Sequence, residues 1–115
     1  MQFTVSLTKN HEFRRVYNRG KTAGASTIAL YVLPNRLGKN RLGITVTTKI
    51  GGAVVRNRIR RRIKEIYRLG EGGLRPSFDL VIVARARASS ATYWQIRADF
   101  QRLVKKLGLL SVGAP

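Results

Sequence analysis

Side chains that could perform acid–base or nucleophilic chemistry are few in this sequence. The chain holds one histidine, His11, no cysteine and five carboxylates. The carboxylates are scattered: Glu12, Glu65, Glu71, Asp79 and Asp99. Catalysis by a protein needs a poised acid or base, a nucleophile with its partner, or clustered metal ligands, and no two of these acids are close enough in sequence to predict a two-metal site. We therefore expect no catalytic residue and no metal site, and without cysteine no disulfide or thiolate site can form.

The chemistry that this sequence does offer is that of fixed positive charge. It has 23 Lys and Arg against 5 Asp and Glu, a net charge of +18 over 115 residues. Residues 49–68 (KIGGAVVRNRIRRRIKEIYR) hold eight of these cations and one acid, Glu65. Such a density on one element predicts a polyanionic partner, with nucleic acid as the first interpretation. It also predicts that stability rises with counterions or with the bound partner.

The basic segment has the periodicity of an amphipathic helix. Four apolar residues fall within about 80° of one another at 100° per residue, which predicts a stripe facing the core: Val55, Ile59, Ile63 and Ile66. A polar edge lies opposite, and on it every fourth residue is basic. We call these four residues the basic ladder: Arg56, Arg60, Lys64 and Arg68. Like charges at this spacing repel, so a merely solvated face is the less favoured alternative. Arg62 falls in the apolar stripe, and we expect its stem to be covered while its guanidinium reaches solvent.

Turn residues and hydrophobic periodicity predict the elements that position this helix. They are a helix over 9–18, strands over 21–23, 27–33, 41–48 and 78–84, the basic helix, and a helix over 93–107. The last helix opens with a capping box of Thr92 and Gln95. Strand 78–84 carries five apolar residues without alternation, which predicts burial on both faces. The order αβββαβα predicts an α+β two-layer sandwich, with helices packed on a four-stranded sheet. We expect one domain over 1–110 and a disordered tail over 111–115.

Aromatic residues near basic ones could bind bases. Phe13 and Tyr17 lie on one face of the first predicted helix, beside three arginines. They are either core residues or stacking platforms for unpaired bases. Strand 41–48 presents a face of small and hydroxyl residues, ends next to Lys49, and should lie close to Tyr31 if its hairpin pairs as expected. That face is either an ordinary solvent face or the floor of a groove.

The basic segment also matches a family motif. Written as Lys49-x-Gly51-x-Ala53-Val54-x-Arg56-Asn57-Arg58-x-Arg60-Arg61-x-x-Lys64-Glu65, it resembles the RNR signature of the bacterial ribonuclease P protein family. The resemblance extends in order and spacing to residues 7–20, 28–33 and 41–49, and covers about residues 3–107. Arg60 stands where the family usually has lysine, and Lys64 where it usually has arginine, so charge is kept. Thr48 stands where lysine is frequent, which weakens the expected grip on phosphate at that strand end.

This resemblance implies a function, two partners and two sets of site residues. The family is the protein subunit of a ribonucleoprotein that removes the 5′ leader from precursor tRNA. The implied partners are the ribonuclease P RNA and the precursor tRNA leader, with Mg²⁺ held through the RNA and no cofactor bound by the protein alone. The residues implied to bind the RNA subunit are Arg56, Asn57, Arg58, Arg60, Arg61, Lys64 and Arg68. Those implied to line a cleft for the single-stranded leader are Phe13, Tyr17, Tyr31, Thr45, Thr47 and Lys49.

Three other functions share part of this pattern. A ribosomal or other structural RNA-binding protein, without a processing role, would have the charge and the basic helix but need no leader cleft. A DNA-binding domain would want a helix-turn-helix pair or a dimer seam, and neither is visible. A self-contained nuclease would need catalytic residues. No segment approaches the ~20 apolar residues of a membrane span, and no signal peptide is indicated, so we expect a cytoplasmic protein without a membrane or an obligate protein partner.

Overall fold

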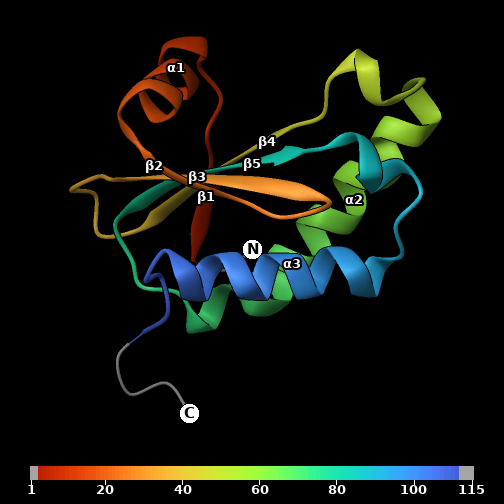
Figure 1. Cartoon of the computed structure of the whole chain (residues 1–115). Helices are drawn as coiled ribbons and strands as arrows, with labels where there is room; N and C mark the ends of the chain where they lie inside the picture. The colour runs from red at the N-terminus through yellow and green to blue at the C-terminus, as the bar shows by residue number, and fades with distance from the viewer. Residues whose placement is uncertain (1–2, 112–115) are drawn as a thin grey trace.

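The computed structural model describes residues 3–111, which form a mixed sheet with helices on both of its faces (Figure 1). The elements in chain order are β1 (Thr4–Ser6), α1 (Asn10–Arg19), β2 (Lys21–Gly24), β3 (Ile28–Pro34), β4 (Asn40–Thr45), η1 (Thr48–Ile50), α2 (Ala53–Gly70), η2 (Glu71–Gly73), β5 (Phe78–Ala84), η3 (Ala86–Ser89) and α3 (Tyr93–Lys106). Every helix and strand predicted from the sequence is present, so the predicted α+β class is confirmed.

The sheet has five strands in the order β1-β4-β5-β3-β2, which corrects the predicted count of four. The additional strand, β1, is three residues long and pairs in parallel with β4 at the sheet edge. Side-chain contacts hold it there: the Thr4 hydroxyl lies 2.8 Å from the Tyr67 hydroxyl and donates to the Glu71 carboxylate at 2.9 Å. So short an edge strand has no periodicity of its own, and only these distant partners define it.

The three helices lie in two layers, one on each side of the sheet. Figure 1 shows α1 above the sheet and α3 below it, with most of α2 on the α3 side. The larger core lies under α2 and α3 and includes Ile63, Tyr67 and Phe100, whereas a smaller core under α1 contains Val16 and Val81. The predicted two-layer arrangement is thereby corrected to three layers. The sequence of β5 already required three layers, because a strand that is buried on both faces needs packed elements on both sides of the sheet.

Strand β5 is the central strand and is buried on both faces as predicted, but it lies between β3 and β4, so the hairpin predicted to pair these two strands does not form. It pairs in parallel with β4 and antiparallel with β3. Leu80 and Ile82 enter the larger core, while Val81 enters the smaller one. The functional surfaces described below are therefore built on a strand whose two faces are both covered by apolar side chains.

Local signals set the helix ends. The capping box of α3 is reciprocal: the Gln95 backbone N–H donates to the Thr92 hydroxyl at 3.2 Å, and the Thr92 N–H donates to the Gln95 side chain at 2.9 Å. Helix α1 begins one residue later than predicted. Its end at Gly20 depends on close approach, because a Cβ there would lie 2.5 Å from the Val16 carbonyl oxygen.

The C-terminal tail was predicted to be disordered from residue 111. The backbone N–H of Ser111 donates to the Gly73 carbonyl at 2.9 Å, so this residue still contacts the fold. Residues 112–115 of the predicted tail, and residues 1–2, lie outside the described residues. The single domain over 1–110 stays a prediction.

Candidate nucleic-acid interface

Three aromatic rings and one hydroxyl residue meet between α1 and the sheet. We call them the aromatic cluster: Phe13, Tyr17, Tyr31 and Thr45. The Tyr17 and Tyr31 rings meet edge to face, with centroids 5.0 Å apart, and the Phe13 and Tyr17 centroids are 6.5 Å apart. The Tyr17 hydroxyl shares a hydrogen bond of 2.7 Å with that of Thr45. All four residues are half-buried, so they are packed against the smaller core and still reach the surface.

A glycine in β4 makes room for this cluster. Gly43 lies on the same face of the sheet as Thr45, two residues on, and a Cβ at Gly43 would lie 2.4 Å from Phe13 Cε1 and 2.5 Å from Phe13 Cζ. These distances are far below van der Waals contact, so the Phe13 ring rests directly on the strand backbone. Any side chain at position 43 would have to displace the ring.

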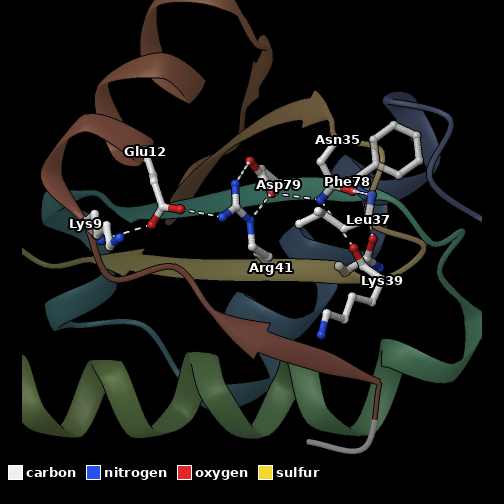
Figure 2. Close-up of polar contacts among 9 residues, drawn as sticks. Lys9, Glu12, Asn35, Leu37, Lys39, Arg41, Phe78 and Asp79 are labelled. Carbon is white, nitrogen blue, oxygen red and sulfur yellow. Dashed lines mark hydrogen bonds and ion pairs between the residues drawn. The ribbon is translucent and has the colours of Figure 1, made fainter.

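A partly buried ionic network ties α1 to the sheet, as Figure 2 shows. The Arg41 guanidinium binds Asp79 in bidentate fashion, with Nε 2.8 Å from Oδ1 and one terminal nitrogen 2.7 Å from Oδ2. Its other terminal nitrogen donates to Glu12, in the first turn of α1. Asn35 donates to Asp79 Oδ1 at 2.8 Å. Because Glu12 immediately precedes Phe13, this network fixes the part of α1 that carries the aromatic cluster.

The network is charged at neutral pH. Burial acts to raise the pKa of Asp79, but hydrogen bonds from Arg41 and Asn35 outweigh it and hold that pKa below its ordinary value. The pKa of Glu12 is lowered first by the hydrogen bond from the Lys9 backbone N–H, and further by Arg41, against a smaller desolvation effect. This network was not predicted from the sequence, although an aspartate in an apolar strand signals a buried partner.

Thr47 and Lys49, the two remaining residues of the predicted cleft, lie beyond the end of β4. Both are exposed, and Lys49 is within η1, the turn that leads into α2. In Figure 1 this turn rises on the same side of the sheet as α1. The structure thus brings Phe13, Tyr17 and Tyr31 into contact, whereas Thr47 and Lys49 extend the surface from the cluster toward the basic helix.

The basic ladder runs along α2 as predicted. Arg56 and Arg60 are half-buried, and Lys64 and Arg68 are exposed. Within residues 3–111, Arg56, Arg60 and Lys64 form no hydrogen bond or ion pair through their charged groups. The same holds there for Arg61, because Glu65, four residues after it, pairs with Arg68 at 2.6 Å. Asn57 is exposed on the same helix. Three of the four ladder cations, and Arg61 beside them, therefore have no neutralising partner within residues 3–111.

Two other arginines of α2 bind backbone carbonyl groups of the protein. Arg58 donates to the Ser89 carbonyl and Arg62 to the Ala91 carbonyl, each at 3.0 Å. Arg58 Nε is buried and has no partner among the described residues. The Arg62 guanidinium was expected to reach solvent and instead binds backbone. Arg58 was predicted to contact RNA, but its visible role is to clamp α2 to the segment before α3, because its helical position faces that segment.

Residues 3–111 contain neither a cluster of potential metal ligands nor a helix that could span a membrane. No group of three or more His, Cys, Asp or Glu within residues 3–111 could hold a metal ion. In the same part of the chain, no helix is both long and apolar enough to cross a bilayer. Together the two surfaces suit a flexible polyanion with unpaired bases. Helix α2 presents cations without a protein partner, and the aromatic cluster presents accessible rings.

Comparison with known proteins gives one consistent result. The family model described as Ribonuclease P matches residues 1–108. The ribonuclease P protein component of Alkaliphilus metalliredigens is 40% identical over 111 residues, which are 96% of this chain and 100% of that protein. That of Clostridium kluyveri is 44% identical over 105 residues, 90% of this chain and 94% of that one.

Solved structures agree. The RNase P protein of Staphylococcus aureus superposes with a TM-score of 0.85 at 29% identity, covering 92% of this chain and 97% of that one. The RNase P protein of Thermotoga maritima gives a TM-score of 0.80 at 28% identity, covering 88% and 96%. The motif of the basic helix, the family model and these likenesses all agree, and the chain therefore belongs to the bacterial ribonuclease P protein family.

Proposed function

We propose that this chain binds two RNAs through two surfaces: the RNA subunit through the basic ladder, and the single-stranded leader of precursor tRNA through the aromatic cluster. Through its family the chain is a protein component of ribonuclease P, the ribonucleoprotein of tRNA 5′ maturation in which the RNA subunit carries out catalysis. The main support for assigning the RNA subunit to the basic ladder is that Arg56, Arg60 and Lys64 have no protein partner among the described residues.

The ladder suits a regular run of phosphates. Successive members are four residues apart on one helix, a rise of about 6 Å per step. Arg56 and Arg60 are half-buried, so neighbouring residues already restrict these side chains and they lose less freedom on binding than fully exposed ones. Each phosphate that such a cation neutralises releases counterions, and the affinity for the RNA subunit should therefore fall steeply with salt.

The aromatic cluster suits unpaired bases. Base stacking on an aromatic side chain contributes about 1–3 kcal/mol per base and tolerates any sequence, because every base has a π-face. The rings of Phe13, Tyr17 and Tyr31 are half-buried and mutually packed, so they are already ordered before a base arrives. In this proposal Thr47 and Lys49 carry the leader backbone onward from the cluster.

The proposal assigns the metal to the RNA. In this proposal Mg²⁺ binds at sites formed by the RNA subunit and assists hydrolysis there. No side chain of this protein holds the ion. In this proposal the protein works in the cytoplasm, and the two RNAs are the only partners that it needs.

A reconstitution assay tests the first surface. A bacterial ribonuclease P RNA is incubated with precursor tRNA at low millimolar Mg²⁺, with and without the protein. The wild type should restore cleavage. The double variant Arg56→Gln/Arg60→Gln should require more protein for half-maximal cleavage and lose about two units of the log–log salt slope. The matched control Lys105→Gln/Lys106→Gln removes the same charge from the exposed last turn of α3. It should change the protein concentration for half-maximal cleavage and the salt slope less than the ladder variant does.

The second surface is tested with substrates that differ in the leader. Phe13→Leu/Tyr17→Leu keeps apolar volume and removes the rings. Its affinity for precursor tRNA should fall, while its affinity for leaderless tRNA and for the RNA subunit should stay near that of the wild type. If both substrates lose affinity equally, the cluster does not bind the leader. If the wild-type protein restores no cleavage and binds this RNA no better than an unrelated one, a general RNA-binding role becomes the better explanation.

A further inference from the structure

The chain's one tryptophan lies outside both surfaces described above. Trp94 is in the first turn of α3 and is 66% exposed. The guanidinium carbon of Arg97 lies 5.4 Å from the centroid of its ring, and the Tyr93 ring meets it edge to face at 5.1 Å. We call these three residues the Trp94 platform. A large ring this exposed is accessible to a flat ligand, and Arg97 adds a cation beside it.

The platform is held rigidly. The capping box of Thr92 and Gln95 sets the turn on which Trp94 stands. Tyr93 is half-buried against the larger core, so the ring beneath Trp94 is fixed by packing. Arg62 of α2 donates to the Ala91 carbonyl at 3.0 Å, which anchors the basic helix just before the platform. A preordered ring pays less entropy on binding than a flexible one.

The surroundings of the platform are apolar and cationic. Arg97 also lines a groove of about 210 Å³ between α2 and α3, together with Leu69 and Leu110. These two leucines are 61% and 45% exposed, and no carboxylate lines the groove. An apolar patch with a basic border is typical of an interaction site. On a chain of net charge +18, a second copy would be repelled, whereas RNA would be attracted.

We propose that the Trp94 platform is a third RNA contact, where the indole stacks on an unpaired nucleobase and Arg97 binds the adjoining phosphate. The inference rests on the RNA-binding function proposed above and extends the RNA footprint to the start of α3. The unpaired base could belong to the RNA subunit or to precursor tRNA. Both have the same chemistry, so the experiment must separate the two sources.

Fluorescence of Trp94 reports on this site directly, because the chain has no other tryptophan. The full-length protein is titrated first with ribonuclease P RNA, and precursor tRNA is then added to the complex. Stacking of a base on the indole should quench its emission. Quenching at the first addition assigns the base to the RNA subunit, and quenching only at the second assigns it to precursor tRNA. A change that follows protein concentration without RNA would indicate self-association and overturn the proposal.

Two substitutions separate stacking from general apolar contact. Trp94→Leu removes the aromatic face and should weaken binding of the RNA identified by the titration about 5- to 100-fold. Trp94→Phe keeps a ring and should retain most of the affinity. The control Phe3→Leu alters another exposed ring, 60% accessible, and should bind as the wild type does. Equal thermal midpoints would show that each variant folds.

The outcomes distinguish this inference from the function on which it rests. If the wild type binds RNA with unchanged emission, and Trp94→Leu binds equally well, the platform is overturned while the ladder and the cluster stand. If the wild type binds none of these RNAs, the proposed function fails and the platform fails with it.

Discussion

Replacing Gly43 by alanine should disturb the aromatic cluster more than any other single methyl group added to the sheet. The new Cβ would lie 2.4 Å from Phe13 Cε1 and 2.5 Å from Phe13 Cζ, so the ring must move. Overpacking of this kind costs about 1–3 kcal/mol. The free energy of unfolding of Gly43→Ala should fall by that amount, as measured by urea denaturation monitored by circular dichroism.

The same substitution should impair leader binding. If the displaced Phe13 ring no longer stacks on a base, the affinity of the reconstituted enzyme for precursor tRNA should fall about 5- to 100-fold. Leaderless tRNA should bind as before, and so should the RNA subunit. The matched control is Gly72→Ala, since a Cβ at Gly72 would have no neighbour within 4 Å.

A double-mutant cycle decides whether the clash with Phe13 is the cause. The three nearest atoms to the Gly43 Cβ position all belong to Phe13. In a Phe13→Ala background, Gly43→Ala should therefore cost nothing, or stabilise the protein by about 0.4–1 kcal/mol through the unfolded chain. A full penalty in that background would refute the reasoning, because the strain would have to arise elsewhere.

Four further predictions concern the scaffold and the basic ladder. The folded-state pKa of Asp79 is lowered, so its charge contributes stability that is complete above its unfolded pKa of about 4 and is lost as pH falls through the folded value. The free energy of unfolding of Asp79→Asn should therefore fall less steeply with decreasing pH than that of the wild type. Arg41→Met strands that buried carboxylate and should cost about 3–5 kcal/mol in urea denaturation, and an unchanged midpoint would contradict the network. Arg58→Met should lower the thermal midpoint with little effect on the salt slope of RNA binding. Arg56→Met should lower that slope by about one unit and leave the thermal midpoint unchanged. Thr92→Ala should cost about 1 kcal/mol, seen as a lower urea midpoint.

Features that depend on neighbouring residues were predictable from the sequence. The capping box of α3 needs only Thr92 and Gln95, three residues apart, and both of its hydrogen bonds form. The basic ladder follows from the helical repeat alone. The apolar run of β5 predicted burial on both faces, and that burial itself required a third layer, which the two-layer prediction overlooked.

The aromatic cluster shows where local reasoning reaches its limit. For Phe13 and Tyr17 the sequence left open whether each ring is a core residue or a surface platform. The structure places both rings half-buried, packed on the smaller core and open at the surface. The contact of Phe13 with Gly43 joins residues thirty positions apart, so no local pattern signals it.

What the sequence determined by itself is the amphipathic helix, its charge, the capped start of α3 and the order of the longer elements, because each depends on spacing within a few residues. Tertiary structure alone decided which arginine of the basic helix bonds to the protein: Arg58 binds the Ser89 carbonyl, whereas Arg56 has no partner among the described residues. It also decided that Arg41 joins Glu12 to Asp79, across 29 and 38 positions of the chain. Identical residue types take different roles because the surfaces packed against them come from distant segments.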